Sequence, residues 1–244
     1  MFSLCITTLN RFDFLKKNIP RYLENGLISE IIISDESSSN DFKLLQEYFP
    51  DNNNKLKLVK NETVLGPFLN KIRCCKEASN EWIVLMDSDN FADIDNYFKI
   101  AQKYITSSSH NINEKTILSP SMASPNFDYK FLANIILTKN NIRNYYNNPM
   151  FNCFINTGNY IINKNLIDTL NFEKDIELIQ KSSACDVKLM NTLFFEQFEN
   201  LNIHVVENMK YDHVVHGESV YLKNYIKTQD TINIVNDRFY KCIF

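Results

Sequence analysis

The sequence predicts an α/β fold in which helices cover both faces of a mostly parallel central sheet. Three observations predict it: apolar runs that do not alternate, segments between them with apolar residues at helical spacing, and polar loops at the ends of the runs. Uninterrupted apolar runs are typical of parallel strands covered on both faces. Strands that alternate with helices build a doubly wound sheet.

The first elements are expected to form a βαβ unit. A strand is expected over 3–8, followed by a helix in which Phe14, Ile19 and Tyr22 recur at helical spacing. Gly26 is expected to end this helix as a C-terminal stop. The apolar run 30–34 then predicts a second strand, parallel to the first.

The same alternation continues to residue 90. The polar loop 35–41 is expected to provide the N-cap of the next helix. The remaining elements of this half are expected as a helix over 42–49, a strand over 56–59, a helix over 68–79 and a strand over 82–86 that runs directly into Asp87-Ser88-Asp89.

The second half is less regular. An Asn- and Tyr-rich stretch, 140–148, has turn composition and is expected to form an exposed connection or a flap. The segment 154–162 is expected to form a hairpin or strand pair around Gly158, and 186–198 has helical periodicity. Because no internal repeat or linker divides the sequence, a single domain over 1–244 is expected.

Composition indicates how large a core the chain can bury and which classes of partner it can bind. The chain has 244 residues, 44% of them hydrophobic, which is enough to bury a core in one globular domain. A formal net charge of -3 and a sequence pI near 5.8 give no basic surface that would hold a polyanion. No nucleic acid partner is therefore expected.

The N-terminal segment and the cysteines bear on location. Residues 1–6 lack the basic start and cleavage site of a secretory signal, and no window reaches the roughly 18 apolar residues of a transmembrane segment. The six cysteines include no Cys-x-x-Cys pair, which favours free thiols in a reducing compartment, so a cytoplasmic protein is expected. Zinc on Cys74-Cys75 is the alternative, although adjacent cysteines rarely ligate one ion.

Polar residues stand at the ends of three expected strands. Ligands of open α/β sheets bind beyond the carboxyl ends of the strands, and Thr7 to Arg11, Asp35 and Asp87-Ser88-Asp89 occupy those ends. A single Asp in such a place is more often a helix cap or a turn residue. Three polar sites at one edge favour a ligand site.

Asp87 and Asp89 are two residues apart, so their side chains share one face if the chain is extended there. Two such carboxylates repel each other unless a cation neutralises them. A hard divalent ion, Mn²⁺ or Mg²⁺, keeps positions open for phosphate oxygens and would join the protein to a diphosphate. This pair of carboxylates is informative because it directly follows an expected apolar strand.

Three motifs in the first ninety residues resemble the family 2-like glycosyltransferases of the GT-A fold, a Rossmann-like fold of nucleotide-diphospho-sugar transferases. They are Thr7-Thr8-Leu9-Asn10-Arg11, the acidic strand end Ile32 to Ser38, and the segment Ala78 to Asp89, in the order and spacing of that family. Leu9 stands where the family often has an aromatic residue that stacks on the base, and Ile72 where an Asn is usual.

The resemblance implies roles for residues of the first half. The implied donor-binding residues are Thr7, Leu9, Arg11, Asp35, Lys71, Asp87 and Ser88. Asp35 would accept hydrogen bonds from the base, most often uracil, while Arg11 and Lys71 are cations suited to the diphosphate. For Arg11, a solvated charge at a helix start is the alternative.

The resemblance also implies that a late histidine completes the metal site with Asp87 and Asp89. His213 and His216 both match, and His216 is favoured because Gly217 allows a backbone turn close to the ion. An ordinary pair of surface or core histidines is the alternative.

The segment Ala184 to Leu189 resembles a Glu-Asp-x-x-Leu motif of the family, with Cys185 in place of the first acid. Asp186 then falls on the position of the general base of inverting members, and a helix cap is the alternative. Asn156 to Tyr160 is similar to the strand that floors the acceptor side in the family.

The sequence thus predicts a metal-dependent, hexosyltransferase-like glycosyltransferase. It would move a sugar from a nucleoside diphosphate donor, a UDP-sugar, to a hydroxyl of a glycan or other acceptor, with inversion. Residues 1–90 would bind the donor and 91–244 the acceptor. A nucleotidyltransferase is the first alternative, against which the missing glycine-rich phosphate loop argues. A catalytically silent sugar-nucleotide-binding protein is the second.

Overall fold

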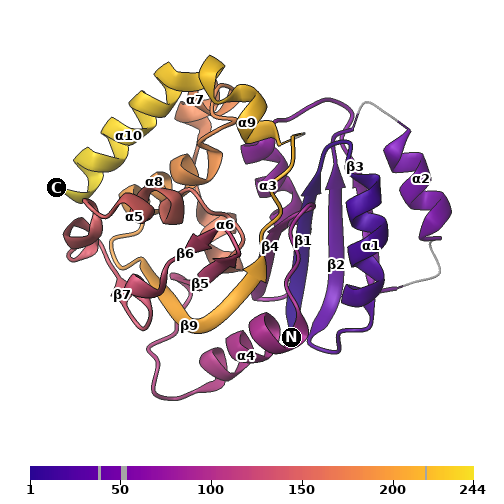
Figure 1. Cartoon of the computed structure of the whole chain (residues 1–244), viewed down its shortest axis with the longest axis horizontal. Helices are drawn as coiled ribbons and strands as arrows, with labels where there is room; N and C mark the ends of the chain where they lie inside the picture. The colour runs from indigo at the N-terminus through magenta and orange to yellow at the C-terminus, as the bar shows by residue number, and fades with distance from the viewer. Residues whose placement is uncertain (38–39, 51–53, 218) are drawn as a thin grey trace.

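A computed structural model describes residues 1–37, 40–50, 54–217 and 219–244. Positions 38 and 39 of the expected loop 35–41 lie outside the described residues. The protein is a mixed α/β structure with helices on both sides of a central sheet (Figure 1). This architecture agrees with the predicted α/β class.

The described strands form one sheet in the order β3-β2-β1-β4-β8-β5-β9-β7, and β6 pairs with β5. β1 to β4 are parallel to one another, β8 joins β4 to β5 by antiparallel pairing, and β9 is parallel to β5. The strands are β1 (Phe2–Thr8), β2 (Ile28–Asp35), β3 (Leu56–Lys60), β4 (Trp82–Asp87), β5 (Thr116–Ser124), β6 (Phe127–Asp128), β7 (Ile136–Leu137), β8 (Ile161–Asn163) and β9 (Asn202–Asp212).

Helices pack on this sheet in two groups. In Figure 1, α1 and α2 lie on one side of β1 to β3, and α3 lies on the other, close to α6 and α8. The α-helices are α1 (Phe12–Leu23), α2 (Asp41–Tyr48), α3 (Pro67–Lys76), α4 (Lys99–Thr106), α5 (Pro149–Ile155), α6 (Lys164–Thr169), α7 (Ile176–Gln180), α8 (Asp186–Gln197), α9 (Val220–Asn224) and α10 (Gln229–Ile243). A π-helical turn (Ile94–Phe98) and 3-10 turns (Lys130–Leu132, Ile142–Tyr145, Glu173–Asp175, Ile226–Thr228) complete the helical segments.

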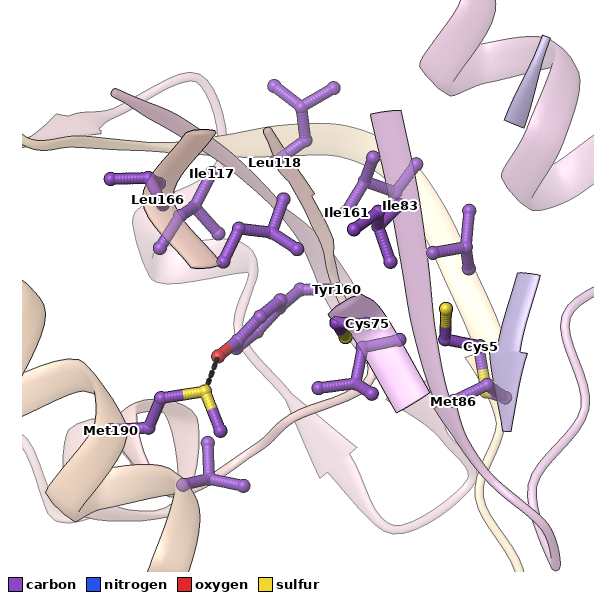
Figure 2. Close-up of a cluster of buried hydrophobic side chains, with 14 of the residues drawn as sticks. Cys5, Cys75, Ile83, Met86, Ile117, Leu118, Tyr160, Ile161, Leu166 and Met190 are labelled. Carbon is purple, nitrogen blue, oxygen red and sulfur yellow. Dashed lines mark hydrogen bonds between the residues drawn. The ribbon is translucent and has the colours of Figure 1, made fainter. Parts of the chain in front are cut away.

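The core lies where α3 and α8 pack against the middle of the sheet (Figure 2). Cys5 and Ile83 of adjacent strands are 0% exposed, as expected for strands covered on both faces. The Tyr160 hydroxyl donates a hydrogen bond to Met190 Sδ of α8 at 3.5 Å, so a buried polar group next to β8 has a partner. In the part of the chain that the structure describes, no helix is long and apolar enough to cross a membrane.

The structure confirms the strands and helices expected in the first half, with three changes at helix ends. α1 ends at Leu23, and Gly26 does not have the left-handed conformation of a glycine stop. The turn is closed instead by the Asn25 side chain, which accepts from Leu27 N. α3 ends at Lys76 rather than at residue 79, because Ser79 N donates to the Glu30 carboxylate of β2.

The expected cap of α2 is also absent. Asn40 occupies the N-cap position without a side-chain hydrogen bond to the helix. Asp41 Oδ2 instead accepts from Phe12 N at the start of α1, 3.1 Å away. The polar loop therefore fastens two helices to each other rather than capping one.

The hairpin expected over 154–162 is wrong. Residues Pro149–Ile155 form α5, because Pro149 suits the first turn of a helix and the Asn148 side chain caps it by accepting from Met150 N. Only Ile161–Asn163 is a strand, β8. The stretch 140–148 contains a 3-10 turn whose Ile142 is buried, so it is an anchored connection and not a free flap.

Candidate active site

A cavity of about 550 Å³ opens beyond the carboxyl ends of β1 and β4. Its walls come from both halves of the chain: the ends of these strands and α3 on one side, and α5, β6 and the start of α8 on the other. This is the place where parallel sheets collect ligands. Two of the strand ends singled out in the sequence, those of β1 and β4, therefore meet at one cavity.

Most of the predicted donor-binding residues line this cavity. They are Thr7, Leu9, Arg11, Lys71, Asp87 and Ser88. Asp35 does not belong to the described lining and is 0% exposed. Its Oδ1 accepts from the backbone N and the hydroxyl of Ser37, and Lys60 Nζ lies 3.2 Å from its Oδ2. Its contact with a base stays a prediction that requires one of these partners to move.

Glu36 lines the cavity and was not singled out in the sequence. Its Oε2 accepts hydrogen bonds from Leu65 N and Gly66 N, each 2.9 Å long, and so fixes the loop that enters α3. Burial raises the pKa of Glu36, although the two backbone donors oppose that shift. The only signal in the sequence is a second acid directly after Asp35.

Lys71 connects the two predicted catalytic regions. Its Nζ lies 3.3 Å from Asp87 Oδ1 at the end of β4 and donates to Asp186 Oδ2 at the start of α8 over 3.0 Å. Burial would lower the pKa of Lys71, but the charges of Asp186 and Asp87 outweigh it and raise the pKa. Lys71, expected at the diphosphate, thus faces two carboxylates.

Asp186 is held by Lys71 rather than by a capping interaction. Cys185 occupies the N-cap position of α8 and makes no side-chain cap, while Asp186 is the first residue of the helix. Burial raises the pKa of Asp186, and the adjacent Lys71 ammonium only partly offsets this rise. A carboxylate with a raised pKa beside an open cavity is suited to accept a proton.

Asn159 fixes Asp87 from the other side. Asp87 N donates to Asn159 Oδ1 at 2.8 Å, and Asn159 Nδ2 donates to Asp87 Oδ2 at 3.2 Å. Each Asp87 oxygen therefore already has a partner, Lys71 or Asn159. In the sequence, Asn159 was singled out only as part of the segment Asn156 to Tyr160.

Asp89 meets the late histidine that was favoured. His216 Nε2 lies 2.7 Å from Asp89 Oδ2, and Arg11 Nε lies 3.9 Å from the same oxygen. The His216 ring also packs on Phe14 of α1, with ring centroids 5.1 Å apart. Gly217 does lie in a turn after His216, where Ser219 N donates to His216 O at 3.2 Å, although Gly217 does not have a left-handed conformation.

His213 lines the cavity, whereas His216 does not belong to its described lining. His213 Nδ1 accepts from Asn126 Nδ2 at 2.9 Å. Burial lowers the pKa of His213, against the raising effect of Asp89 and Asp87. His213 is thus a neutral wall residue near the site.

The donor types at this edge suit a hard divalent ion, since they are carboxylate oxygens and an imidazole nitrogen. Asp89 and His216 are already paired, but Asp87 is turned toward Lys71. Among the residues that the structure describes, no group of three His, Cys, Asp or Glu side chains is placed to hold a metal ion. The expected set of three ligands, Asp87, Asp89 and His216, is therefore not assembled. Two of its members, Asp89 and His216, are in contact.

The sequence profile of glycosyl transferase family 2 matches residues 3–159. No curated protein matches the chain significantly. Solved structures are similar in fold: TarS of S. aureus with UDP-GlcNAc has a TM-score of 0.67 at 17% identity, over 97% of this chain and 66% of that one. The chain spans 38% to 66% of the TarS chains that it matches.

Two further structures hold Mn²⁺. The mannosyltransferase PcManGT of Pyrobaculum calidifontis with GDP-Man has a TM-score of 0.61 at 12% identity, over 93% of this chain and 60% of that one. The glucosyl-3-phosphoglycerate synthase of Mycobacterium tuberculosis with UDP and phosphoglyceric acid has a TM-score of 0.60 at 14% identity, over 98% and 78%. At these identities the likeness concerns the fold alone, and it confirms the predicted GT-A fold class.

Proposed function

Because the chain belongs to glycosyl transferase family 2, we propose that it moves a sugar from a UDP-sugar to a hydroxyl of a glycan or other acceptor, with inversion at the transferred sugar. The observation that carries this proposal is the Asp87–Lys71–Asp186 chain of contacts across one cavity. It joins the predicted donor side, residues 1–90, to the predicted acceptor side, residues 91–244, within one domain. A cytoplasmic location stays a prediction from cysteine usage.

The donor would lie along the ends of β1 and β4. Thr7, Leu9 and Ser88 line that part of the cavity, and Arg11 adds a cation near Asp89. UDP is favoured over other nucleotides because it or UDP-GlcNAc is bound in the similar TarS and synthase structures. GDP-Man in PcManGT is the reason to test guanine donors as well.

Mn²⁺ or Mg²⁺ would be held by Asp89 and His216, with Asp87 and His213 as the further predicted ligands. When bound, the ion would supply positive charge that stabilises the diphosphate as it leaves. The Mn²⁺ complexes of two similar structures support the choice of a divalent ion. Lys71 contributes indirectly, since it pairs with Asp87 and Asp186 and holds both carboxylates in place.

Asp186 would act as the general base. The acceptor oxygen forms a bond to the anomeric carbon, the bond from that carbon to the diphosphate oxygen breaks, and the hydroxyl proton passes to the Asp186 carboxylate. A single displacement of this kind inverts the configuration. The burial that raises the pKa of Asp186 makes it a stronger proton acceptor than a solvated carboxylate.

Slow hydrolysis of the donor tests the proposal without knowledge of the acceptor. UDP-sugars and GDP-sugars are incubated with the protein and Mn²⁺, or with a chelator, and release of the nucleoside diphosphate is measured. Mn²⁺-dependent release from one donor is expected. Binding of a donor without any turnover would favour the silent alternative, and release of pyrophosphate from a nucleoside triphosphate and a sugar phosphate would favour a nucleotidyltransferase.

A further inference from the structure

The acceptor side of the cavity is almost free of charge. By acceptor side we mean, from this point, the part of the cavity lining contributed by β6, α5 and the segments 156–159, 183–187 and 211–215. Among its described side chains, Asp186 is the one carboxylate, and no Lys or Arg belongs to this part of the lining. The cations of the cavity lie on the donor side, where Lys71 contacts two carboxylates and Arg11 approaches Asp89.

One buried lysine orients a polar group of this acceptor side. Lys188 of α8 is 4% exposed, and its Nζ donates to Asn152 Oδ1 at 2.7 Å and to Asn236 Oδ1 at 2.5 Å. No carboxylate pairs with Lys188 within the described residues, and burial lowers its pKa to about 8. Because the ammonium takes the Asn152 oxygen, the amide N–H groups of Asn152 are left to donate into the cavity.

Two other polar side chains of the acceptor side, those of Asn156 and Thr157, already form hydrogen bonds within the protein. Asn156 accepts from Lys188 N and donates to Ala184 O. The Thr157 hydroxyl donates to Cys153 O and also contacts the Tyr129 hydroxyl. These groups shape the wall, so the donors that a ligand would meet are the Asn152 amide, which Lys188 orients, and the Ser183 hydroxyl.

Phe127 supplies an apolar part of the same lining. Its ring is half-buried, lies parallel to Tyr129 at a centroid distance of 6.2 Å, and meets the His213 ring edge-on at 5.1 Å. The C–H groups of a sugar ring pack favourably on the electron-rich face of an aromatic ring. A few placed polar groups beside an aromatic wall are typical of pockets for small polar ligands.

From these features we infer that the acceptor is an uncharged sugar, whose ring packs on Phe127 and one of whose hydroxyls accepts a hydrogen bond from the Asn152 amide. A second hydroxyl would reach Asp186 and be glycosylated. The inference rests on the proposed transferase function and names its acceptor class. A phosphate or carboxylate on the acceptor would lie near the Asp186 carboxylate, while the adjacent Lys71 ammonium is already shared by Asp186 and Asp87, which is unfavourable in a partly desolvated cavity.

Matched acceptors test this inference. With saturating UDP-sugar and Mn²⁺, methyl glycosides of common hexoses are compared with the 6-phosphates of the same sugars and with phosphoglycerate. At least one uncharged glycoside is expected to accelerate UDP release, with a kcat/KM at least about tenfold above that of its phosphate, a ratio equal to about 1.4 kcal/mol. A phosphorylated acceptor that is equal or better overturns the inference.

The assay separates failure of this inference from failure of the proposed function. If the donor is hydrolysed but no uncharged sugar in the panel accelerates UDP release, the acceptor inference is overturned and the transferase site stands. If no donor is bound or hydrolysed at all, the proposed function is wrong, and the acceptor inference falls with it.

Substitutions of the two asparagines that accept from Lys188 provide a matched pair. Asn152→Asp and Asn236→Asp each place a carboxylate on the same ammonium, but only Asn152 lines the cavity. Asn152→Asp should raise KM for the uncharged acceptor about tenfold or more, because it removes the N–H donor and adds a charge. Asn236→Asp should leave this KM near that of the wild type. Equal effects of the two changes, or none from Asn152→Asp, contradict the assignment.

Discussion

At the scale of single residues, the site depends on one ammonium that two carboxylates share. Lys71 lies between Asp87 and Asp186, which would otherwise repel each other in a region where little water screens them. A buried charge is tolerated when it is paired in this way. The contact also fixes where the donor and acceptor sides meet, since α3 carries the lysine and α8 carries Asp186.

Asp186→Asn tests the role of the predicted base. The amide keeps the shape of the side chain but cannot take the proton, so transfer should fall by about 10² to 10⁴ in kcat. The melting temperature should change less than activity, because Lys71 keeps Asp87 as a carboxylate partner and Cys185, not Asp186, is at the N-cap position. Turnover, melting curves and NMR of the product are the measurements. A retained anomeric configuration would rule out this role.

His216→Ala and His213→Ala separate the two histidine candidates. His216 is in contact with Asp89, so its removal should raise the Mn²⁺ concentration required for donor hydrolysis by about tenfold or more, as losses around metal sites commonly do. His213→Ala should have the smaller effect, since Asn126 holds its Nδ1. A Mn²⁺ titration of each variant checks this, and the reverse order would assign the ligand to His213.

At the scale of elements, a close contact positions the start of α8. A Cβ on Gly158 would lie 2.7 Å from Cγ2 of Val187, the residue after the predicted base. Gly158→Ala should therefore displace α8, lower the free energy of unfolding by about 1–3 kcal/mol, and reduce transfer. Urea unfolding and turnover measure both effects.

Two further variants make that prediction specific. Gly26→Ala, whose Cβ would meet nothing within 4 Å, is the control and should cost little stability. The double variant Gly158→Ala/Val187→Ala should recover part of the lost activity, because the shorter side chain clears the contact. An unchanged defect in the double variant would mean that another interaction is responsible.

The packing of α4 on β9 predicts a pH dependence of stability. His204 shares a hydrogen bond of 3.1 Å with the Tyr104 hydroxyl, and burial, with a contribution from His110, lowers its pKa to about 4. Between pH 6.5 and 4 the unfolded chain binds a proton here that the native protein does not. Stability contributed by neutral His204 is therefore present above pH 6.5 and declines as the pH falls through this window.

Melting curves from pH 7.5 to 4.5 measure this decline. His204→Gln removes the titrating ring and should make the melting temperature less dependent on pH over the same range. A variant with the same pH dependence as the wild type would place the titrating group elsewhere.

At the scale of the whole molecule, a single sheet connects the donor and acceptor sides. β8 pairs with β4 on one edge and β5 on the other, so the parallel strands of the first half continue into the strands of the second. The end of β9 then leads to His213 and His216. A ligand that binds between the sides should therefore stabilise the entire fold.

UDP and Mn²⁺ together should raise the melting temperature of the whole chain. At concentrations 100 times the dissociation constant, binding adds about 2.7 kcal/mol to the stability of the native state. UDP with a chelator should give a much smaller shift, because Asp87 and Asp89 would face the diphosphate without a neutralising ion. Equal shifts in both conditions would contradict metal dependence.

The sequence alone determined the elements of the first half and the edge of the sheet at which the cavity opens. The apolar runs ending in Thr7, Asp35 and Asp87 predicted strands whose ends meet, and the structure confirms those strands. The reason is that burial of a strand or a helix face repeats along the chain with a local period. Periodicity failed at 154–162, where an Asn-Pro cap made a helix out of an apolar run.

Only the tertiary structure decided which distant residues meet. Lys71 reaches Asp186 across 115 positions of the chain, and Asp89 reaches His216 across 127. Asn159 closes on Asp87, although nothing in its local sequence distinguishes it from other asparagines. Such pairs depend on the distances and angles at which packed elements are held. Local sequence periodicity records which face of an element is buried, but not which residue of another element covers it.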